Sequence, residues 1–234
     1  TASRSQVIFR VIGGVIFADV IGNRAQLESA LQEDVPCVVI NNYVKDLDVN
    51  CIAIDNTEGA KKAVNYLIGL GHKKVAHIAG DVVTQAAAER LQGYKEALEE
   101  NKIPVNPAYI FKTDYSRGQA RSAAEKMIKM QEPPTAVFVA SDSMALEVMA
   151  VAKELRRNIP KDLSIVGFDD NPSGLYGPVA LTTVRQPLIK MAQDSVKELN
   201  LLMQHKEKRK AKKILLATEL VIRESSQPLD SRST

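Results

Sequence analysis

With 234 residues, 45% of them hydrophobic and 25% charged, the chain can bury the core of one large or two small domains without disulfides or metals. The 31 basic and 28 acidic residues leave a net charge of +3, so charge alone does not indicate a nucleic-acid surface. Apolar runs such as 75–79 are too short to span a bilayer. We therefore expect a soluble globular protein without a membrane partner.

The cysteine content predicts neither a disulfide framework nor a metal site. Cys37 and Cys51 are the only two cysteines, and no third ligand lies at metal-binding spacing. Both lie in apolar surroundings that suit reduced, packed thiols. No secretory signal opens the sequence, which could also begin after one. We expect a cytoplasmic protein with no metal and no cofactor.

The first third of the chain alternates short apolar segments with amphipathic ones. Apolar spacing predicts a helix from Asn23 to Asp34 with Asn23 as its N-cap, and a second helix over 56–70 that Gly71 ends. The expected strands of this part are 7–9, 14–17, 37–41 and 51–54.

From residue 75 onward, strands and helices alternate regularly. The expected pairs of strand and following helix are 75–80 with 85–101, 109–112 with 116–130, and 136–140 with 142–157. Parallel strands need helical crossovers, so this alternation predicts an α/β fold with a doubly wound parallel sheet. The chain then runs through 163–168 and 181–184 to a helix over 187–204 and a last strand over 214–222.

The stretch 163–170 carries the clearest candidate site. A buried strand runs through Gly167 into the two carboxylates Asp169 and Asp170. In open α/β sheets, ligands bind at the carboxyl ends of the strands, where Asp169 would lie. The alternative is a plain turn, because Asp-Asp-Asn-Pro is also good turn chemistry.

Five segments carry a family resemblance. They look like the effector-binding region of the lactose/galactose repressor (LacI/GalR) family of bacterial transcription regulators, and they occur in the family's order and spacing. They are Leu-Gly-His-Lys-Lys-Val-Ala-His-Ile-Ala-Gly (70–80), Glu-Arg-Leu-Gln-Gly-Tyr (89–94), Pro-Thr-Ala-Val-Phe-Val-Ala-Ser-Asp (134–142), Ile-Pro-Lys-Asp-Leu-Ser-Ile-Val-Gly-Phe-Asp-Asp (159–170) and Leu-Thr-Thr-Val-Arg-Gln-Pro (181–187). The last segment separates these repressors from periplasmic sugar-binding proteins of the same fold.

The resemblance implies two Rossmann-like doubly wound parallel-sheet subdomains of the type I periplasmic-binding-protein class, joined by three crossing segments. We expect these crossings near 70–72, 184–187 and 206–213. The N-terminal subdomain would hold 1–70 and 187–208, the C-terminal one 71–186 and 209–225, and 226–234 would be a tail. Family members carry a DNA-binding headpiece and two strand-helix units before the point where this sequence starts. The N-terminal subdomain is therefore expected to be incomplete here.

For effector binding, the resemblance favours Asp169 and Arg90. An ionised carboxylate offers only acceptors, and a guanidinium presents a planar fork of donors that can hold a ligand oxygen and a carboxylate together. Arg90 stands at the position of the family's effector arginine. The alternative is a solvated helix arginine paired with Glu89 or Glu96.

Three further residues complete the expected effector site. Tyr115 would offer an aromatic face to a sugar or base, or would be a locally packed turn residue. Ser141 stands where sugar-responsive relatives often use Asn. Asp19 is the N-terminal candidate, or a plain helix cap. Asp142 is better explained as the acid at the N-terminus of the following helix.

The histidines and the basic run have simpler explanations than chemistry. We interpret His72 and His77 as structural, because neither has an acid or nucleophile beside it in the sequence, and we find no motif that would support an enzyme. The basic run 206–213 contains no aromatic residue, so a solvated crossing loop is favoured over a nucleic-acid patch.

The segment 143–157 is apolar nearly all round, although a helix on a sheet needs one apolar face only. As in the family, we expect this helix to contribute to a homodimer through the C-terminal subdomain. Our hypothesis is the sensor of a repressor that binds a small effector, a sugar or derivative, and alters operator DNA binding through a headpiece outside this chain. The alternatives are a periplasmic-type sugar receptor for transport or chemotaxis and an α/β enzyme.

Overall fold

The computed structural model describes residues 13–18, 22–42, 44, 46–204 and 210–229. The chain divides into two compact units, Thr1–Asp55 with Pro187–Ala217 (unit 1) and Asn56–Gln186 with Thr218–Thr234 (unit 2). Two of the three expected crossings are therefore wrong. The chain first changes unit after Asp55, not near 70–72, and it changes for the third time after Ala217, not within 206–213.

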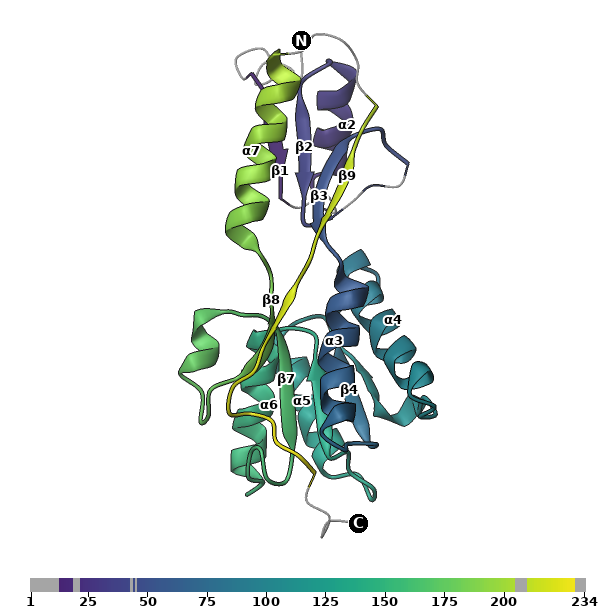
Figure 1. Cartoon of the computed structure of the whole chain (residues 1–234), viewed down its shortest axis with the longest axis vertical. Helices are drawn as coiled ribbons and strands as arrows, with labels where there is room; N and C mark the ends of the chain where they lie inside the picture. Colours follow the sequence, from purple (N-terminus) through teal and green to yellow (C-terminus); the bar gives the residue numbers. More distant parts are fainter. Residues whose placement is uncertain (1–12, 19–21, 43, 45, 205–209, 230–234) are drawn as a thin grey trace. The chain divides into compact units, whose positions relative to one another are not determined.

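Unit 1 is built on a parallel sheet of four strands in the order β1-β2-β3-β9 (Figure 1). Short segments rich in β-branched residues, such as Cys-Val-Val-Ile, alternate with helical ones, which is the pattern of parallel strands with helical crossovers. Its elements are β1 (Val15–Phe17), α2 (Arg24–Gln32), β2 (Cys37–Ile40), β3 (Asn50–Ile54), α7 (Leu188–Gln204) and β9 (Lys213–Leu216).

Helix α7 covers part of this sheet and leaves an apolar surface exposed. It contacts β1, β2 and β3 and buries Met191 among its residues. On its outer side, the side chains of Leu188, Ile189 and Val196 are 58%, 78% and 52% exposed. Asn23 precedes α2 at the N-cap position, but its side chain makes no capping hydrogen bond.

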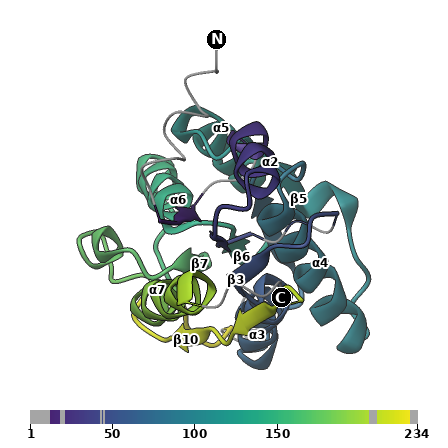
Figure 2. The same cartoon turned by 90° about the horizontal axis from the view of Figure 1, so that it is seen from above.

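Unit 2 contains a six-stranded sheet in the order β10-β8-β7-β6-β4-β5, parallel except for the β10–β8 pair. Helices α3 and α4 cover one face, and α5 and α6 cover the other (Figures 1 and 2). The elements are α3 (Asn56–Gly69), β4 (Val75–Ala79), α4 (Gln85–Glu100), the 3-10 helix η1 (Pro107–Tyr109), β5 (Ile110–Lys112), α5 (Arg117–Ile128), β6 (Ala136–Val139), α6 (Asp142–Glu154), β7 (Ser164–Asp169), the 3-10 helix η2 (Pro172–Leu175), β8 (Thr182–Arg185) and β10 (Glu219–Val221).

Local sequence signals place the helix ends in unit 2. Thr84, Ser116 and Ser141 cap α4, α5 and α6 through side-chain oxygens that accept backbone N–H bonds. Gly71 follows α3 with a φ of +92°, the left-handed conformation expected of a residue that ends a helix. The capped helices α4, α5 and α6 begin just beyond the carboxyl ends of β4, β5 and β6. Their first turns therefore lie at the edge of the sheet that holds the candidate site.

Two features of the C-terminal part differ from the expectation. The apolar run 214–222 is not one strand, because β9 pairs with β3 in unit 1 and β10 pairs with β8 in unit 2. Nor is the described part of the expected tail loose. The Leu229 amide donates to the Leu70 carbonyl at 2.8 Å, and His72 Nε2 lies 3.1 Å from the Gln227 carbonyl oxygen.

The apolar circumference of α6 is covered within unit 2. Helix α5 and η2 both contact α6, and Met144, Val148, Met149 and Val151 are 1% exposed or less. Within unit 2, η2 therefore provides a cover for α6 that its Pro-containing sequence did not predict, and the contribution of this helix to a homodimer stays a prediction. Among the described residues, no helix is long and apolar enough to cross a membrane.

Candidate functional site

The structure brings Asp169 and Arg90 together at the carboxyl ends of the unit 2 strands. Asp169 is the last residue of β7, and Arg90 projects from the second turn of α4. Arg90 Nη1 lies 3.7 Å from Asp169 Oδ1. The Asp169 side chain is 34% exposed and the Arg90 side chain only 7%, so a ligand would meet the carboxylate first with the arginine behind it.

Arg90 is held in a fixed orientation from three sides. Its Nε donates to Asn56 Oδ1 at 2.9 Å, and its Nη1 donates to the Ala140 carbonyl at 2.5 Å. The guanidinium carbon lies 3.7 Å from the centroid of the Phe168 ring, in a cation–π contact. The alternative of a solvated helix arginine is therefore wrong, because this side chain is buried and its donors point into the unit.

Burial and charge oppose each other in this pair. Burial raises the pKa of Asp169, while the charge of Arg90 and a hydrogen bond from Gln186 act to lower it. Burial lowers the pKa of Arg90, and the Asp169 charge counteracts this effect. A guanidinium stays protonated in either case, so the site presents one fixed positive and one accessible acidic group.

The two adjacent aspartates have different partners. Gln186 Nε2 donates to Asp169 Oδ1 at 2.6 Å, whereas Asp170 pairs with Arg185 and Arg223, each at 2.6 Å. The backbone at Asp169 and Asp170 has φ values of +120° and +58°, which non-glycine residues rarely adopt. Such strain is found mainly at functional sites and persists where the surroundings fix it, as the two arginines do here.

Asp142 holds the end of β7 in place through hydrogen bonds to neighbouring segments, a role that the sequence did not reveal. Its Oδ1 accepts from the Thr183 hydroxyl at 2.6 Å and its Oδ2 accepts from the Asn171 amide at 2.7 Å. A Cβ at Gly167 would lie 2.3 Å from Asp142 Oδ1, so only glycine admits the carboxylate here. Burial raises the pKa of Asp142 to about 7. The explanation as a simple helix N-terminal acid is incomplete, because its main partners are long-range.

Tyr115 and Ser141 lie at the same strand ends. The Tyr115 ring occupies the space over Gly80, where a Cβ would lie 1.9 Å from its Cζ. Burial raises the pKa of Tyr115 and the nearby Arg90 charge lowers it, so the phenol shares the field of the site. The Ser141 hydroxyl accepts from the Met144 amide at 3.4 Å as the N-cap of α6. Their contacts with an effector stay predictions, and Asp19 lies outside the described residues.

Three residues of this site were missed from the sequence. Asn56 and Gln186 bind Arg90 and Asp169 directly, and Phe168 lies under the guanidinium. Gln186 belongs to the Thr-Thr-Val-Arg-Gln-Pro segment, so the motif contained a signal for it. Asn56 and Phe168 had none beyond their places next to a helix start and a strand end.

The histidines have structural partners. His72 Nδ1 lies 2.9 Å from the Thr135 hydroxyl. His77 is stacked between Tyr94 and Phe138, with ring centroids 5.1 and 4.8 Å away, and burial lowers its pKa to about 4. Both are held as neutral core side chains. In the described part of the chain, no group of three or more His, Cys, Asp or Glu residues could hold a metal ion.

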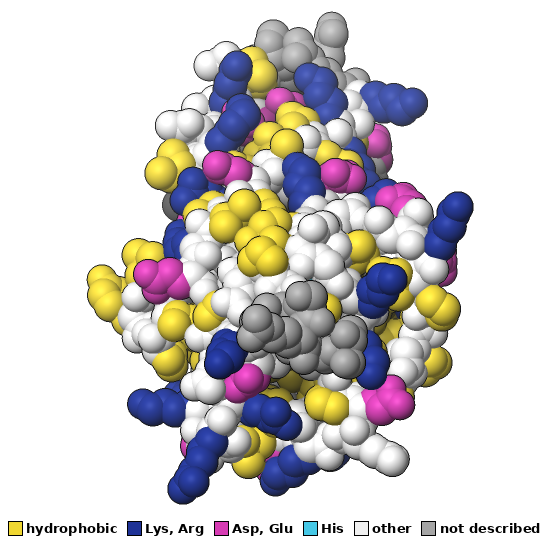
Figure 3. All heavy atoms as spheres, turned by 60° about the horizontal axis from the view of Figure 1, so that its bottom comes forward, with side chains coloured by type: hydrophobic (Ala, Val, Ile, Leu, Met, Phe, Trp, Pro, Cys, Tyr) yellow, Lys and Arg dark blue, Asp and Glu magenta, His cyan; other side chains and the backbone are white. Residues whose placement is uncertain are grey.

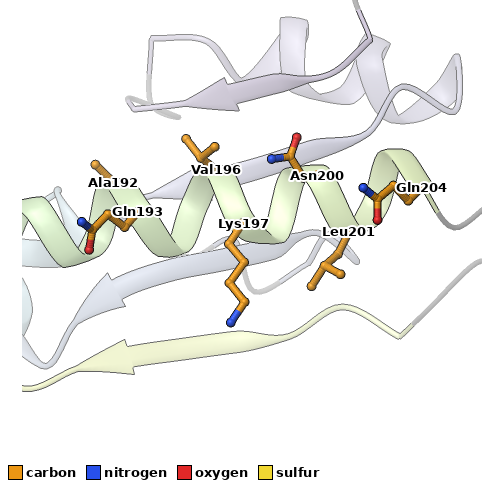
Figure 4. Close-up of a pocket in the computed structure, with 7 residues that line it drawn as sticks. All are labelled: Ala192, Gln193, Val196, Lys197, Asn200, Leu201 and Gln204. Atoms are coloured by element: carbon orange, nitrogen blue, oxygen red, sulfur yellow. The ribbon is translucent and has the colours of Figure 1, made fainter.

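A groove of about 640 Å³ lies along one flank of α7 in unit 1 (Figure 4). Ala192, Val196 and Asn200 point to one side of the helix, and Lys197 and Leu201 point to the other. All of its lining residues come from this one helix, and Lys197 is the one charged side chain among them. A ligand site needs polar groups that converge from several elements, which the Arg90–Asp169 site has and this groove lacks.

The surface charge does not form a single basic field on the face that Figure 3 shows. There, Lys and Arg side chains are spread among acidic and apolar ones. Part of the basic run 206–213 also belongs to unit 1, where Lys213 begins β9 and the Lys212 amide donates to Asn50 Oδ1 at 2.6 Å. The expectation of a crossing loop is therefore wrong at Lys213, which lies in a strand, although Lys212 and Lys213 are exposed as expected of a solvated run.

Comparison with known proteins identifies the family. Residues 64–226 match the periplasmic binding protein-like domain. A regulatory protein of the LacI family from Chloroflexus aggregans is 31% identical, with a TM-score of 0.86 over 97% of this chain and 83% of that one. The chain belongs to the LacI family.

Other LacI-family relatives agree. The transcriptional repressor CytR of Escherichia coli (strain K12) is 33% identical over 226 residues, which cover 95% of this chain and 65% of CytR. A complex of the regulator CelR with cellobiose is 27% identical, with a TM-score of 0.84 over 94% of this chain and 68% of that one. The chain thus spans about two thirds of the length of its curated relative, and the resemblance read from the five sequence segments is confirmed.

Proposed function

We propose that this chain is the effector-sensing part of a bacterial LacI-type transcription regulator. The observation that carries the proposal is the juxtaposition of Arg90 and Asp169 at the strand ends of unit 2. A fixed guanidinium beside an accessible carboxylate suits a ligand with several hydroxyl groups, because the carboxylate accepts and the guanidinium donates. Tyr115 adds an aromatic face of the kind on which sugar rings stack. The effector class is therefore a sugar or a sugar derivative.

The regulatory mechanism would be a population shift. Effector binding favours one of two arrangements of the two units, and this changes the affinity of a DNA-binding part outside this chain for its operator. The effector must bind the two arrangements unequally, since a ligand with equal affinity for both shifts nothing. The names of the relatives, which are repressors and regulators, support this function over that of a transport receptor or an enzyme.

Titration calorimetry with a panel of sugars and nucleosides that includes cellobiose tests the site. We expect Asp169→Ala and Arg90→Ala to weaken binding of any sugar that the wild type binds by about 100-fold, since each removes a charged hydrogen-bonding partner. Asp162→Asn, at an exposed carboxylate of the same unit, is the matched control and should bind like the wild type. Unchanged binding by both alanine variants, with native circular dichroism, would refute the assignment.

The homodimer is proposed through η2 and the adjoining side of α6 in unit 2. Leu175 and Tyr176 are 51% and 85% exposed. The loop packs closely on α6 at the next residue, Gly177, because a Cβ there would lie 3.1 Å from Leu146 Cδ2. Exposed aromatic and aliphatic side chains are typical of interface centres. Light scattering should show a wild-type dimer and a Tyr176→Lys monomer. The control is Val83→Lys, an equally exposed apolar residue of another loop, and a dimeric Tyr176→Lys would exclude this interface.

A further inference from the structure

The polypeptide passes between the two units at three points, after Asp55, after Gln186 and after Ala217. Two of these points coincide with residues that bind the effector-site side chains. Asn56 is the first residue of unit 2 after the first point, and Gln186 is the last before the second. The partner of Asn56 is Arg90, and the partner of Gln186 is Asp169.

The Asn56–Arg90 bond is buried and has few alternatives. Asn56 is 3% exposed; its Oδ1 accepts from Arg90 Nε, and its Nδ2 donates to Glu89 at 3.2 Å. The guanidinium is planar, so a ligand oxygen that reorients one of its donors also reorients Nε. Any such movement of Arg90 acts on the residue at which the chain enters unit 2.

The Gln186–Asp169 bond connects the second point to the carboxylate. Gln186 Nε2 donates to Asp169 Oδ1, the same oxygen that faces Arg90. The other end of the amide, Oε1, is buried and has no hydrogen-bond partner among the described residues. An unpaired buried acceptor is costly, so an alternative position in which Oε1 finds a donor would be favoured once Asp169 no longer holds Nε2.

The third point serves as a contrast. Thr218 follows it, and the Thr218 carbonyl accepts from Lys62 of α3 at 2.9 Å. A Cβ at Gly59 would lie 3.0 Å from Thr218 Oγ1, so this segment packs on α3. Its described contacts are with a helix of the scaffold and not with Arg90 or Asp169, so the three segments are not equivalent.

We propose that Asn56 and Gln186 are positioning residues that couple the occupation of the Arg90–Asp169 site to the first two segments joining the units. This inference rests on the proposed function, because it assigns a route by which a ligand at that site biases the arrangement of the units. A donor group of the ligand that binds Asp169 competes with Gln186, and an acceptor group that binds Arg90 draws on Asn56. Both segments then respond to one binding event.

The coupling can be measured without effector or DNA. Single-molecule energy transfer in the full chain, between dyes on Glu33→Cys in unit 1 and Glu99→Cys in unit 2, reports the distribution of distances between the units. Both positions are exposed, and Cys37 and Cys51 are buried. The variants are Asp169→Asn, Gln186→Leu and the two combined, with Gln92→Leu at an exposed glutamine of α4 as the matched control.

We expect Asp169→Asn and Gln186→Leu each to shift the mean transfer efficiency, and the double variant to show no larger shift than either one alone. Gln92→Leu should leave the distribution unchanged. Shifts that add in full, or no shift with Asp169→Asn, would overturn the coupling through Gln186. A second cycle tests the first segment in the same way, with Asn56→Ala, Arg90→Lys and the two combined. If these variants do not fold, the cycle of Asp169→Asn and Gln186→Leu alone decides.

The outcome separates this inference from the proposed function. Sugar binding in calorimetry with additive shifts in the double variant would keep the sensor function and refute the coupling. Non-additive shifts in a chain that binds no sugar of the panel would keep the coupling and refute the proposed effector class. The two experiments share no reagent apart from the protein, so neither result follows from the other.

Discussion

Both units have an α/β fold, but helices cover the sheet of unit 2 more completely than that of the described part of unit 1. In unit 2, helices cover both faces of the six-stranded sheet; one core cluster packs α5 and α6 on the strands, and Phe168 packs near Phe138 and under Arg90. In the described part of unit 1, the four-stranded sheet has α2 and α7, and α7 leaves Leu188, Ile189 and Val196 exposed. A strained, charged candidate site needs a rigid support, and unit 2 supplies it.

The difference should be visible as unequal local stability. Hydrogen exchange followed by mass spectrometry resolves the two units peptide by peptide, and we expect the amides of β6 and β7 to exchange much more slowly than those of β1 and β2. A chain with two such units need not unfold in a single step, so we expect a substitution to act first on the unit in which the residue lies.

The largest expected effect concerns Asp142 of unit 2. Its pKa of about 7 in the folded protein exceeds the ordinary value of 3.8, so between these pH values the unfolded chain ionises while the folded one does not. The free energy of unfolding therefore falls as pH rises from about 4 to about 7 and levels off above that. A shift of this size corresponds to something on the order of 4 kcal/mol.

Asp142→Asn mimics the protonated carboxyl, because its oxygen can accept from the Asn171 amide and its NH2 can donate to Thr183 Oγ1. We expect this variant to be clearly more stable than the wild type at pH 8, less so at pH 5 and nearly equal to it at about pH 4, measured by urea unfolding with exchange in β7 as the readout. Exchange in unit 1 should not change with the substitution. An equal loss of stability at all three pH values would contradict the assigned protonation state.

Two residues of α7 provide the corresponding test in unit 1. Met191 is 3% exposed and Ile189 is 78% exposed, although they are two positions apart in one helix. Met191→Ala should destabilise unit 1 by about 3 kcal/mol through the lost burial and the cavity left behind, whereas Ile189→Ala should change stability by less than about 0.5 kcal/mol. Faster exchange in β2 with Met191→Ala, and unchanged exchange in β7, would show that the units are energetically separate. A similar cost for both substitutions would mean that the outer side of α7 is covered.

The sequence predicted the elements well where the signal is local. Regular alternation after Val75 predicted the strands β4 to β7 and their helices to within a few residues, because apolar periodicity and caps such as Thr84 are local features. It failed where partners are distant. The sequence around Leu70 contains a Gly-His turn that marks a helix end equally well within a domain, so it did not reveal that α3 packs on α4 and belongs to unit 2.

The candidate site shows the same division. Asp169 and Arg90 were found because motif positions are readable in one chain, and they lie 3.7 Å apart. The role of Asp142 could not be predicted, since Thr183 lies 41 residues away and nothing in the intervening sequence links the two. Gln186 lies within the Thr-Thr-Val-Arg-Gln-Pro motif, but a glutamine after a strand carries no chemical signal until its partner is known.

The smallest expected effect, and the most discriminating in sign, concerns two helical glycines of unit 2. In a helix interior, Gly→Ala usually stabilises by about 0.5–1 kcal/mol, and Gly118→Ala on α5 should do so in part, because nothing lies within 4 Å of the new methyl group.

At Gly93 of α4 a Cβ would lie 2.2 Å from the Thr57 carbonyl oxygen of α3. That oxygen is backbone and cannot rotate away, so Gly93→Ala should destabilise unit 2 by roughly 1–3 kcal/mol. Urea unfolding of the two variants beside the wild type measures both shifts. Opposite signs would establish that α3 and α4 pack backbone to backbone, which fixes Asn56 and Arg90 on neighbouring helices; a stabilising Gly93→Ala would show that these helices are further apart and that the Asn56–Arg90 bond is looser than its 2.9 Å indicates.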